Sequence, residues 1–203
     1  MEFEKIFALL ADERNFARNN YVPVIRDKSA KFLYDFVQKN NIKKVLEIGT
    51  AIGYSGSIML SAGVESLTTI DINREYLKMA RATFDKLGFG EKVKIIHNDA
   101  KIVISELVKS NEHFDMIFLD GAKGQYLYYL DDLIQLIGKT GVIFADNVLL
   151  GGMVESSEKI PHRKRTMVVN LRKYLDKVNT APLETELVRI EDGIAITKYK
   201  GEW

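Results

Sequence analysis

Short apolar runs rich in β-branched residues alternate with stretches of helical periodicity along most of the chain. Strand followed by helix, repeated, predicts a mostly parallel sheet with helices on both of its faces. The segment 191–193, Glu-Asp-Gly, suits a tight turn, so the last two strands should form an antiparallel hairpin. The sequence therefore predicts an α/β fold with seven strands, from the runs at 43–49, 66–71, 92–97, 114–120, 141–146, 186–190 and 193–199.

Two stretches predict helices in more detail. Between the second and third runs, Asn73 is a candidate N-cap, residues 76–87 keep helical spacing, and Gly88 is placed to end the helix. Residues 1–40 predict two helices broken around 19–23, which we expect to pack on or over the ligand-binding edge of the sheet.

Length and composition restrict the class of protein. A chain of 203 residues with 46% hydrophobic residues is expected to form one domain, 1–203. There is no Cys, so a metal would be held by oxygen or His ligands. No apolar run is long enough to span a membrane, and the charged beginning, MEFEKIFALLADERNF, does not suit a signal peptide. We expect a cytoplasmic protein.

A glycine loop follows the first predicted strand. The spacing Gly49-x-x-x-Gly53 departs from the G-x-G-x-x-G of dinucleotide-binding loops, and Glu47 just before it would repel a phosphate. An acid there suits the ammonium of a cofactor with an amino-acid end, whereas the loop taken alone is equally explained as a structural turn. Asp71, which closes the second strand, is placed to accept hydrogen bonds from ribose hydroxyls.

Oxygen side chains also follow the fourth and fifth predicted strands. Asp120, Asp146 and Asn147 are expected at the edge of the sheet where ligands bind in open α/β folds. Each residue alone is explained as a cap of the next turn, but together they predict a site for Mg²⁺, Mn²⁺ or Ca²⁺. Lys123 is a candidate general base for a hydroxyl activated by that metal, or else an ordinary solvated lysine.

These motifs resemble those of the metal-dependent O-methyltransferases, the superfamily of catechol and caffeoyl-CoA O-methyltransferases. The segments are VLEIGTAIGYS, DIN, NDA, FLDGAK and ADN, in the order of that family. The resemblance implies a Rossmann-like methyltransferase sheet, S-adenosylmethionine as cofactor, Mg²⁺ as the metal, Lys123 as the catalytic base, and a homodimer. It also implies cofactor contacts from Ile25, Glu47, Gly49, Ser55, Asp71, Asp99, Ala100 and Asp120.

Within that superfamily, YVPVI, LDGAKGQY, ADNVLLGG and PHRKRTMVVNLRKY are similar to the bacterial tRNA 5-hydroxyuridine methyltransferases. The segment 159–177 holds seven Lys or Arg residues and one Asp, whereas the net charge of the whole chain is +1. We interpret Arg163, Lys164 and Arg165 as contacts to RNA phosphates, with a solvated helix face as the alternative.

The predicted function is methylation of 5-hydroxyuridine in tRNA anticodon loops. A small catechol-like acceptor is the alternative with the same chemistry. An NAD-dependent oxidoreductase is disfavoured by the glycine spacing, and a noncatalytic RNA-binding module would leave Asp120, Asp146 and Asn147 without a role.

Overall fold

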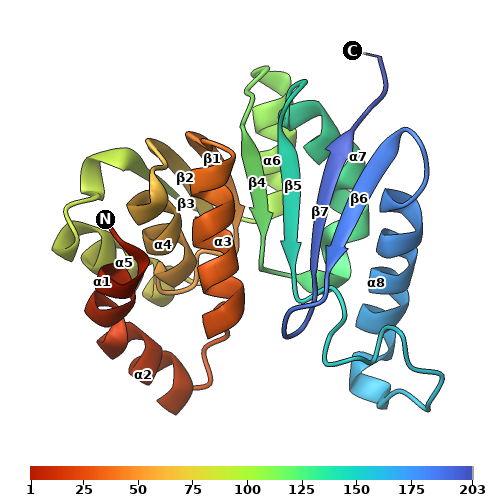
Figure 1. Ribbon diagram of the computed structural model, residues 1–203, viewed down its shortest axis with the longest axis horizontal. Helices are drawn as coiled ribbons and strands as arrows, with labels where there is room; N and C mark the ends of the chain where they lie inside the picture. The colour runs from red at the N-terminus through yellow and green to blue at the C-terminus, as the bar shows by residue number, and fades with distance from the viewer. Residues whose placement is uncertain (203) are drawn as a thin grey trace. The chain divides into compact units, whose positions relative to one another are not determined.

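The computed structural model describes residues 1–202 and divides into two compact units (Figure 1). The first unit is Met1–Val103, and the second starts at Ile104. The strand order of the seven-stranded sheet is β3-β2-β1-β4-β5-β7-β6, with three strands from the first unit and four from the second. The predicted α/β class, with seven mostly parallel strands and a final antiparallel pair, is confirmed.

The first unit contains three parallel strands. They are β1 (Lys44–Ile48), β2 (Ser66–Asp71) and β3 (Val93–His97). Strand β2 pairs with both of the others, Val45 lying opposite Leu67 and Leu67 opposite Val93. Four successive residues are buried in β1 and again in β2. Because neighbouring side chains of a strand point to opposite faces, both faces of these strands are covered.

Helix α5 (Arg74–Lys86) forms where its sequence signals predict it. The side chain of Asn73 accepts hydrogen bonds from the backbone N–H groups of Glu75 and Tyr76, as an N-cap does. Gly88 has a φ of 75°, a left-handed conformation that glycine adopts without strain at a helix end. Helix α4 (Tyr54–Ala62) and the short 3₁₀ turn η1 (Gly90–Lys92) complete this part of the unit.

The prediction of two N-terminal helices was wrong in number. The structure has three: α1 (Phe3–Leu9), α2 (Ala11–Asn19) and α3 (Asp27–Lys39). The extra break falls at Leu10, where the carbonyl of Phe7 accepts a hydrogen bond from Arg14 Nη1 at 2.6 Å. The same guanidinium lies 3.5 Å from the centre of the Phe7 ring. Helices α1 and α3 pack against α4.

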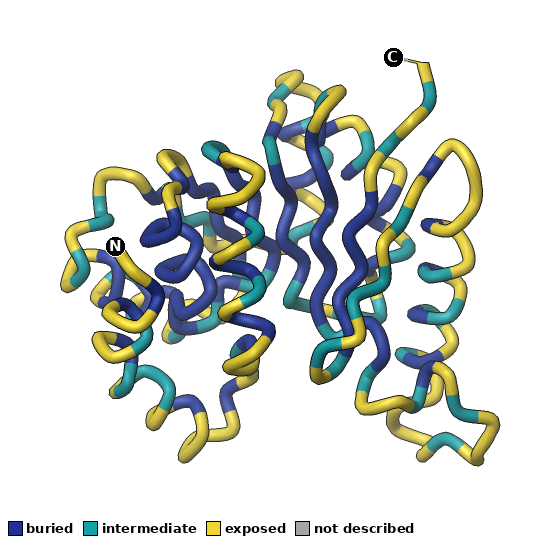
Figure 2. Tube along the Cα trace, viewed as in Figure 1, coloured by how far each residue is buried: buried dark blue, intermediate teal, exposed yellow. Residues whose placement is uncertain are grey.

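The second unit holds the other four strands. Strands β4 (Met116–Leu119) and β5 (Val142–Asp146) are parallel, and β7 (Ile194–Tyr199) lies antiparallel to both β5 and β6 (Leu183–Val188). Every residue of β4 and β5 is buried, which Figure 2 shows as continuous dark blue. The hairpin turn is longer than predicted, because β6 ends at Val188 and residues 189–193 connect it to β7.

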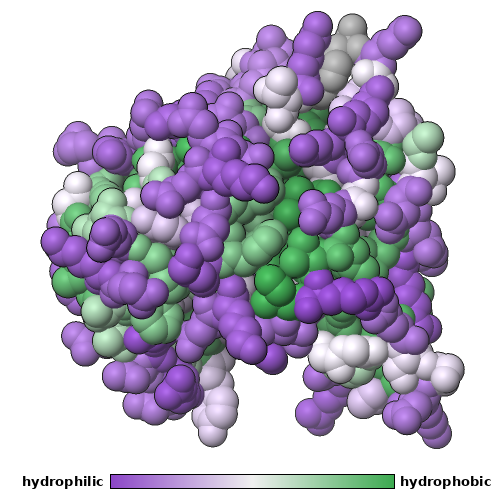
Figure 3. All heavy atoms as spheres, in the orientation of Figure 1, coloured by the Kyte–Doolittle hydropathy of each residue, from purple (hydrophilic) through white to green (hydrophobic). Residues whose placement is uncertain are grey.

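The remaining helices are α6 (Ala100–Lys109), η2 (Lys123–Gln125), α7 (Tyr126–Leu136), η3 (His162–Lys164) and α8 (Arg165–Val178). On the face seen in Figure 3, hydrophobic side chains gather over β5 and β7, and hydrophilic side chains cover most of the remainder. Among residues 1–202, no helix is both long enough and apolar enough to cross a bilayer.

Candidate functional site

The glycine loop joins β1 to α4 through a series of left-handed residues. Gly49, Ala51 and Gly53 have φ values of 103°, 44° and 81°. A Cβ atom at Gly53 would lie 3.1 Å from the Cα of Ala80 on α5, so a larger residue would push this helix away from the loop. The loop therefore requires glycine at Gly53 both for its backbone conformation and for the close approach of α5.

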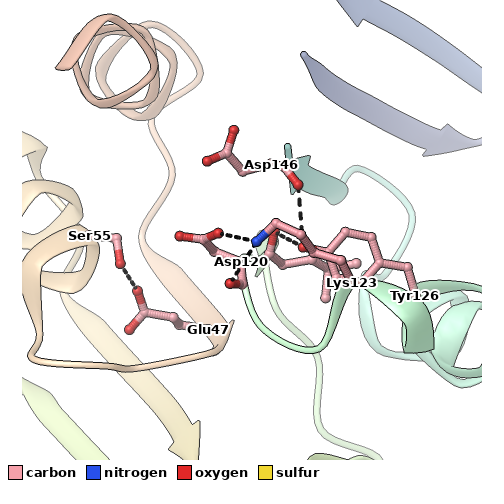
Figure 4. Close-up of polar contacts among 7 residues, drawn as sticks. Glu47, Ser55, Asp120, Lys123, Tyr126 and Asp146 are labelled. Atoms are coloured by element: carbon pink, nitrogen blue, oxygen red, sulfur yellow. Dashed lines mark hydrogen bonds and ion pairs between the residues drawn. The ribbon is translucent and has the colours of Figure 1, made fainter. Parts of the chain in front are cut away.

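Glu47 is fully buried and is hydrogen-bonded to the residues around the glycine loop. Its Oε1 accepts a hydrogen bond from Ser55 Oγ at 2.5 Å (Figure 4), and its Oε2 accepts one from Thr69 Oγ1 at 2.6 Å. Thr69 Oγ1 lies 2.6 Å from the hydroxyl of Thr50. The two threonines had no predicted role, since nothing in the sequence distinguishes them from other β-branched residues of a strand and its loop.

Asp71 fixes the end of β2 to the loop. Its Oδ2 accepts a hydrogen bond from the backbone N–H of Ala51, and its Oδ1 accepts one from the N–H of Asn73, both at 2.9 Å. Each carboxylate oxygen has a second lone pair, so the side chain retains acceptor capacity for a ligand hydroxyl. The position of this carboxylate is set by the backbone around it.

The other predicted cofactor residues of the first unit lie in different surroundings. Asp99 is exposed, and its Oδ1 accepts a hydrogen bond from the backbone N–H of Lys101 at 2.8 Å, which begins α6. Ala100, the first residue of that helix, is partly exposed. Ile25 lies between α2 and α3 with 2% of its surface exposed.

The second unit brings Asp120 and Lys123 together. Ala122, with a φ of 44°, turns the chain back after β4, and Lys123 Nζ then lies 3.1 Å from Asp120 Oδ1 (Figure 4). The side chain of Lys123 is 16% exposed and that of Asp120 is 9% exposed. Burial raises the pKa of Asp120, and the positive charge of Lys123 opposes that rise.

Asp146 ends β5 and is fully buried. Neither carboxylate oxygen makes a hydrogen bond of normal geometry with the residues that the structure describes. Burial, followed by repulsion from Asp120, raises the pKa of Asp146 to about 8, against a weaker opposite effect of the Asn147 N–H. Burying a carboxylate without a partner is costly, so this position favours a bound cation.

Tyr126 holds the two acidic strand ends in place. Its hydroxyl donates to the carbonyl of Leu119 at 2.9 Å and lies 3.3 Å from the carbonyl of Asp146 (Figure 4). These carbonyls belong to the residue before Asp120 and to Asp146 itself. No local sequence signal indicates this role, because the contact joins β4, β5 and α7, which are separate in the chain.

Asn147 has a φ of 57°, a left-handed conformation that asparagine tolerates better than most residues. The two residues after it are fixed by the hairpin turn between β6 and β7. The N–H of Val148 donates to the carbonyl of Gly193 at 3.0 Å, and the N–H of Leu149 donates to that of Asp192 at 2.8 Å.

The donor set fits a hard divalent cation. Two carboxylates and an amide oxygen are ligands that such ions prefer, and neither buried oxygen of Asp146 has a hydrogen-bond partner of normal geometry among the described residues. Among the described residues no group of three or more His, Cys, Asp or Glu side chains is placed to hold a metal, so the third protein ligand would be Asn147. Of the described residues, Lys123 is the one whose positive charge lies within ion-pair distance of Asp120.

The basic segment 159–177 divides into two parts. Arg163, Lys164 and Arg165 are exposed on η3 and at the start of α8. Arg172 is instead used internally: its guanidinium donates to the carbonyls of Val154 and Ser156 at 2.7 and 2.6 Å. The first three remain available to a partner, whereas Arg172 holds the loop after β5.

The strand order and the helices around the sheet are those of a Rossmann-like methyltransferase fold. The O-methyltransferase family model matches residues 5–200, and the chain belongs to this family. A caffeoyl-CoA O-methyltransferase of Arabidopsis thaliana is 31% identical over 178 residues, which are 83% of this chain and 68% of the plant protein. One from Populus kitakamiensis is 28% identical, over 82% of this chain and 73% of the relative.

A solved structure from Staphylococcus aureus, provisionally described as a caffeoyl-CoA O-methyltransferase, has a TM-score of 0.84 to this chain. It is 28% identical, with 97% of this chain and 98% of the other covered. An O-methyltransferase of Bacillus cereus, solved in complex with S-adenosylhomocysteine, has a TM-score of 0.83 at 21% identity and covers 98% of this chain and 92% of its own. The fold is therefore that of the O-methyltransferases.

Proposed function

We propose that this protein transfers the methyl group of S-adenosylmethionine to a hydroxyl oxygen of its acceptor, with a divalent metal held by Asp120, Asp146 and Asn147. The observation that carries the proposal is the fully buried carboxylate of Asp146, which has no hydrogen-bond partner of normal geometry among the described residues. It is repelled by the nearby carboxylate of Asp120, whose side chain is 9% exposed. A purely structural aspartate would be expected to cap a turn or to pair with a cation of the protein.

The first unit would hold the cofactor. Glu47 orders the glycine loop through Ser55, and Asp71 offers its remaining lone pairs to the ribose hydroxyls. S-adenosylmethionine, when bound, supplies an electrophilic methyl group. The solved O-methyltransferase TomG of Streptomyces achromogenes, a protein with the same fold, was determined in complex with this compound.

The second unit would prepare the acceptor. The metal, when bound, supplies Lewis acidity that makes a hydroxyl easier to deprotonate. Lys123, whose Nζ lies 3.1 Å from Asp120 Oδ1, would take the hydroxyl proton, and Asp120 and Asp146 would hold the metal. Tyr126 keeps both strand ends in position through its contacts with the carbonyls of Leu119 and Asp146. The oxygen so deprotonated would receive the methyl group, and S-adenosylhomocysteine would be the second product.

We further propose that the acceptor is the 5-hydroxyl of 5-hydroxyuridine in a tRNA anticodon loop. This base places the hydroxyl next to the carbonyl oxygen at carbon 4, so it offers two neighbouring oxygens as a catechol does. The unpaired bases of a loop are accessible to an enzyme, unlike those of a duplex. The exposed Arg163, Lys164 and Arg165 supply the positive charge that RNA phosphates require.

The decisive experiment compares two purified tRNA substrates, one with 5-hydroxyuridine and one with uridine at the same position. With Mg²⁺ and S-adenosylmethionine, the first should yield 5-methoxyuridine by nucleoside mass spectrometry, and the second should remain unmodified. Failure to methylate the hydroxylated tRNA would refute the tRNA acceptor.

A small catechol-like acceptor is the second candidate, because the plant relatives are named for caffeoyl-CoA. Efficient methylation of a catechol by a protein that leaves hydroxylated tRNA unchanged would establish this candidate in place of the first.

A further inference from the structure

A basic hollow lies on the surface of the first unit, between α5 and β3. Its volume is about 580 Å³, and it is lined by Arg74, Leu77, Lys78, Arg81, Ile95 and His97. Four of these six side chains carry or can accept a positive charge, and none of the described residues that line the hollow is acidic. None of the six has a role in the cofactor loop or in the proposed metal site.

The cationic side chains form a row on one face of α5. Arg74, Lys78 and Arg81 are spaced by four and three residues, which places them on the same side of a helix. With a rise of about 1.5 Å per residue, the row extends roughly 10 Å along the helix axis. That length exceeds the size of a single phosphate group, so the row suits a ligand that carries several anionic groups in sequence.

Much of the hydrogen-bonding capacity of the row is unused. Arg74 makes no hydrogen bond or ion pair within the described part of the chain, and Arg81 uses one nitrogen for the carbonyl of Gly90 at 3.4 Å. Lys78 is partly neutralised by Glu75, at 2.8 Å, but both side chains of this pair are largely exposed. A surface pair of this kind is weak and exchanges readily for a stronger anion.

The opposite wall is formed by β3. His97, at the end of this strand, lies with Nε2 3.1 Å from the carbonyl of Ile72. Leu77, which is 6% exposed, and the half-buried Ile95 give the hollow an apolar floor. A positively charged groove that follows the phosphate backbone is a feature of sites that bind single-stranded nucleic acid, and here an apolar floor lies between the cations and β3.

We infer that the hollow between α5 and β3 binds the phosphodiester backbone of a single-stranded RNA segment. The inference rests on the proposed function, in which the substrate is an RNA, and adds a second contact surface besides the one assigned to Arg163, Lys164 and Arg165. Arg74 and Lys78 contact successive phosphates, Arg81 extends the row, and Leu77 with Ile95 supports the apolar part of the nucleotide.

The test measures binding of a fluorescently labelled 15-residue oligouridylate to the full chain by fluorescence anisotropy, over a range of KCl concentrations. This probe has no 5-hydroxyl, so binding is measured separately from methyl transfer. The variant combines Arg74→Gln and Lys78→Gln. The control combines Lys39→Gln and Lys94→Gln: both lysines are exposed, and Lys94 alternates with Ile95 on β3 and so faces away from the hollow. The two variants lose the same charge.

The hollow variant should bind the oligonucleotide about tenfold or more weakly at 0.1 M KCl, and its salt slope should fall by about 1.4, the contribution of two phosphate contacts. The control should stay within about twofold of the unchanged protein, and thermal unfolding should show that both variants are folded. Equal weakening of the two variants would overturn the inference, since the effect would then be one of net charge.

Two further outcomes separate this inference from the proposed function. Methylation of hydroxylated tRNA together with unaltered RNA binding by the hollow variant would refute the RNA contact at the hollow and leave the function standing. Specific weakening by the hollow variant, without methylation of hydroxylated tRNA, would support the hollow and refute the function. Thermal stabilisation by inorganic phosphate or ATP, in a protein that binds no oligouridylate, would assign the hollow to small phosphates and overturn the RNA inference.

Discussion

Asp146 gives the metal-free protein an unusual dependence of stability on pH. Its pKa is about 8 in the folded protein, mainly through burial and then through repulsion by Asp120, and about 4 in an unfolded chain. Between these values the folded state binds the proton and the unfolded state does not, so the free energy of unfolding decreases as pH rises. A carboxylate with a lowered pKa would have the opposite effect.

We therefore expect the melting temperature in EDTA to fall as the pH is raised from about 5 to 8. The fall should be larger in the unchanged protein than in Asp146→Asn. Differential scanning fluorimetry of the two proteins across this range measures the effect. Saturating Mg²⁺ should remove most of the decrease in the unchanged protein, because the cation stabilises the ionised carboxylate. Parallel pH profiles for the two proteins in EDTA would show that Asp146 is not protonated in the folded state.

Lys123 is expected to act on the acceptor proton rather than on the cofactor. Lys123→Met should lower the turnover number about 10²–10⁴-fold, the usual contribution of a general base, and leave the affinity for S-adenosylmethionine within about threefold. Single-turnover rates and isothermal titration measure the two quantities. Lys101→Met, at an exposed lysine of α6, is the matched control. A rate within about twofold of the unchanged enzyme would leave activation to the metal alone.

At the scale of elements, the β6–β7 turn supports the loop after β5. A Cβ atom at Gly193 would lie 2.4 Å from Leu149 Cγ, and its φ of 77° disfavours any side chain. Gly193→Ala should therefore lower the free energy of unfolding by about 2–4 kcal/mol, through strain and overpacking together.

Gly138→Ala is the matched control, since Gly138 has a φ of 58° and open space around its Cα. It should cost about 1 kcal/mol through backbone strain alone. Urea denaturation measures both free energies. Equal losses in the two variants would mean that Leu149 moves aside freely and that the turn does not restrain the loop after Asn147.

Helix α8 and the η3 turn before it should contribute phosphate contacts at their exposed beginning only. Replacing Arg163, Lys164 and Arg165 with Ala should lower the salt slope of RNA binding by about 2, as three lost contacts to single-stranded RNA predict. Anisotropy titrations at several KCl concentrations provide the slope. An unchanged slope would identify the segment as an ordinary solvated surface of the helix.

For the whole molecule, the proposed function implies that the cofactor and the metal bind to different sets of residues. Apart from Asp120, the residues proposed to contact the cofactor lie in the first unit, and those proposed to hold the metal lie in the second. Chelation with EDTA should abolish methyl transfer, yet S-adenosylhomocysteine should still raise the melting temperature, whereas NAD should not. Thermal shift and methyl-transfer assays on the same sample test this. Full activity in excess EDTA would exclude a metal-dependent reaction.

Much of this architecture follows from local sequence signals. The alternation of apolar runs and helical stretches predicted the seven strands, and Asn73 and Gly88 predicted the limits of α5, because strand periodicity, capping and glycine conformations depend on neighbours in the chain. Acidic residues after predicted strands were sufficient to indicate Asp120 and Asp146, since the ends of parallel strands meet at one edge of a sheet.

Only the tertiary structure decided how these side chains are used. At Leu10, where the first helix ends, the side chain of Arg14 takes the carbonyl of Phe7 as its hydrogen-bond acceptor. The other cases depend on contacts between residues distant in the chain: the hydrogen bonds to both Glu47 oxygens, the position of Tyr126 and the internal hydrogen bonds of Arg172. The physical reason is that periodicity reports which face of an element is buried, whereas hydrogen bonding and desolvation are set by the particular atoms that folding brings against that face.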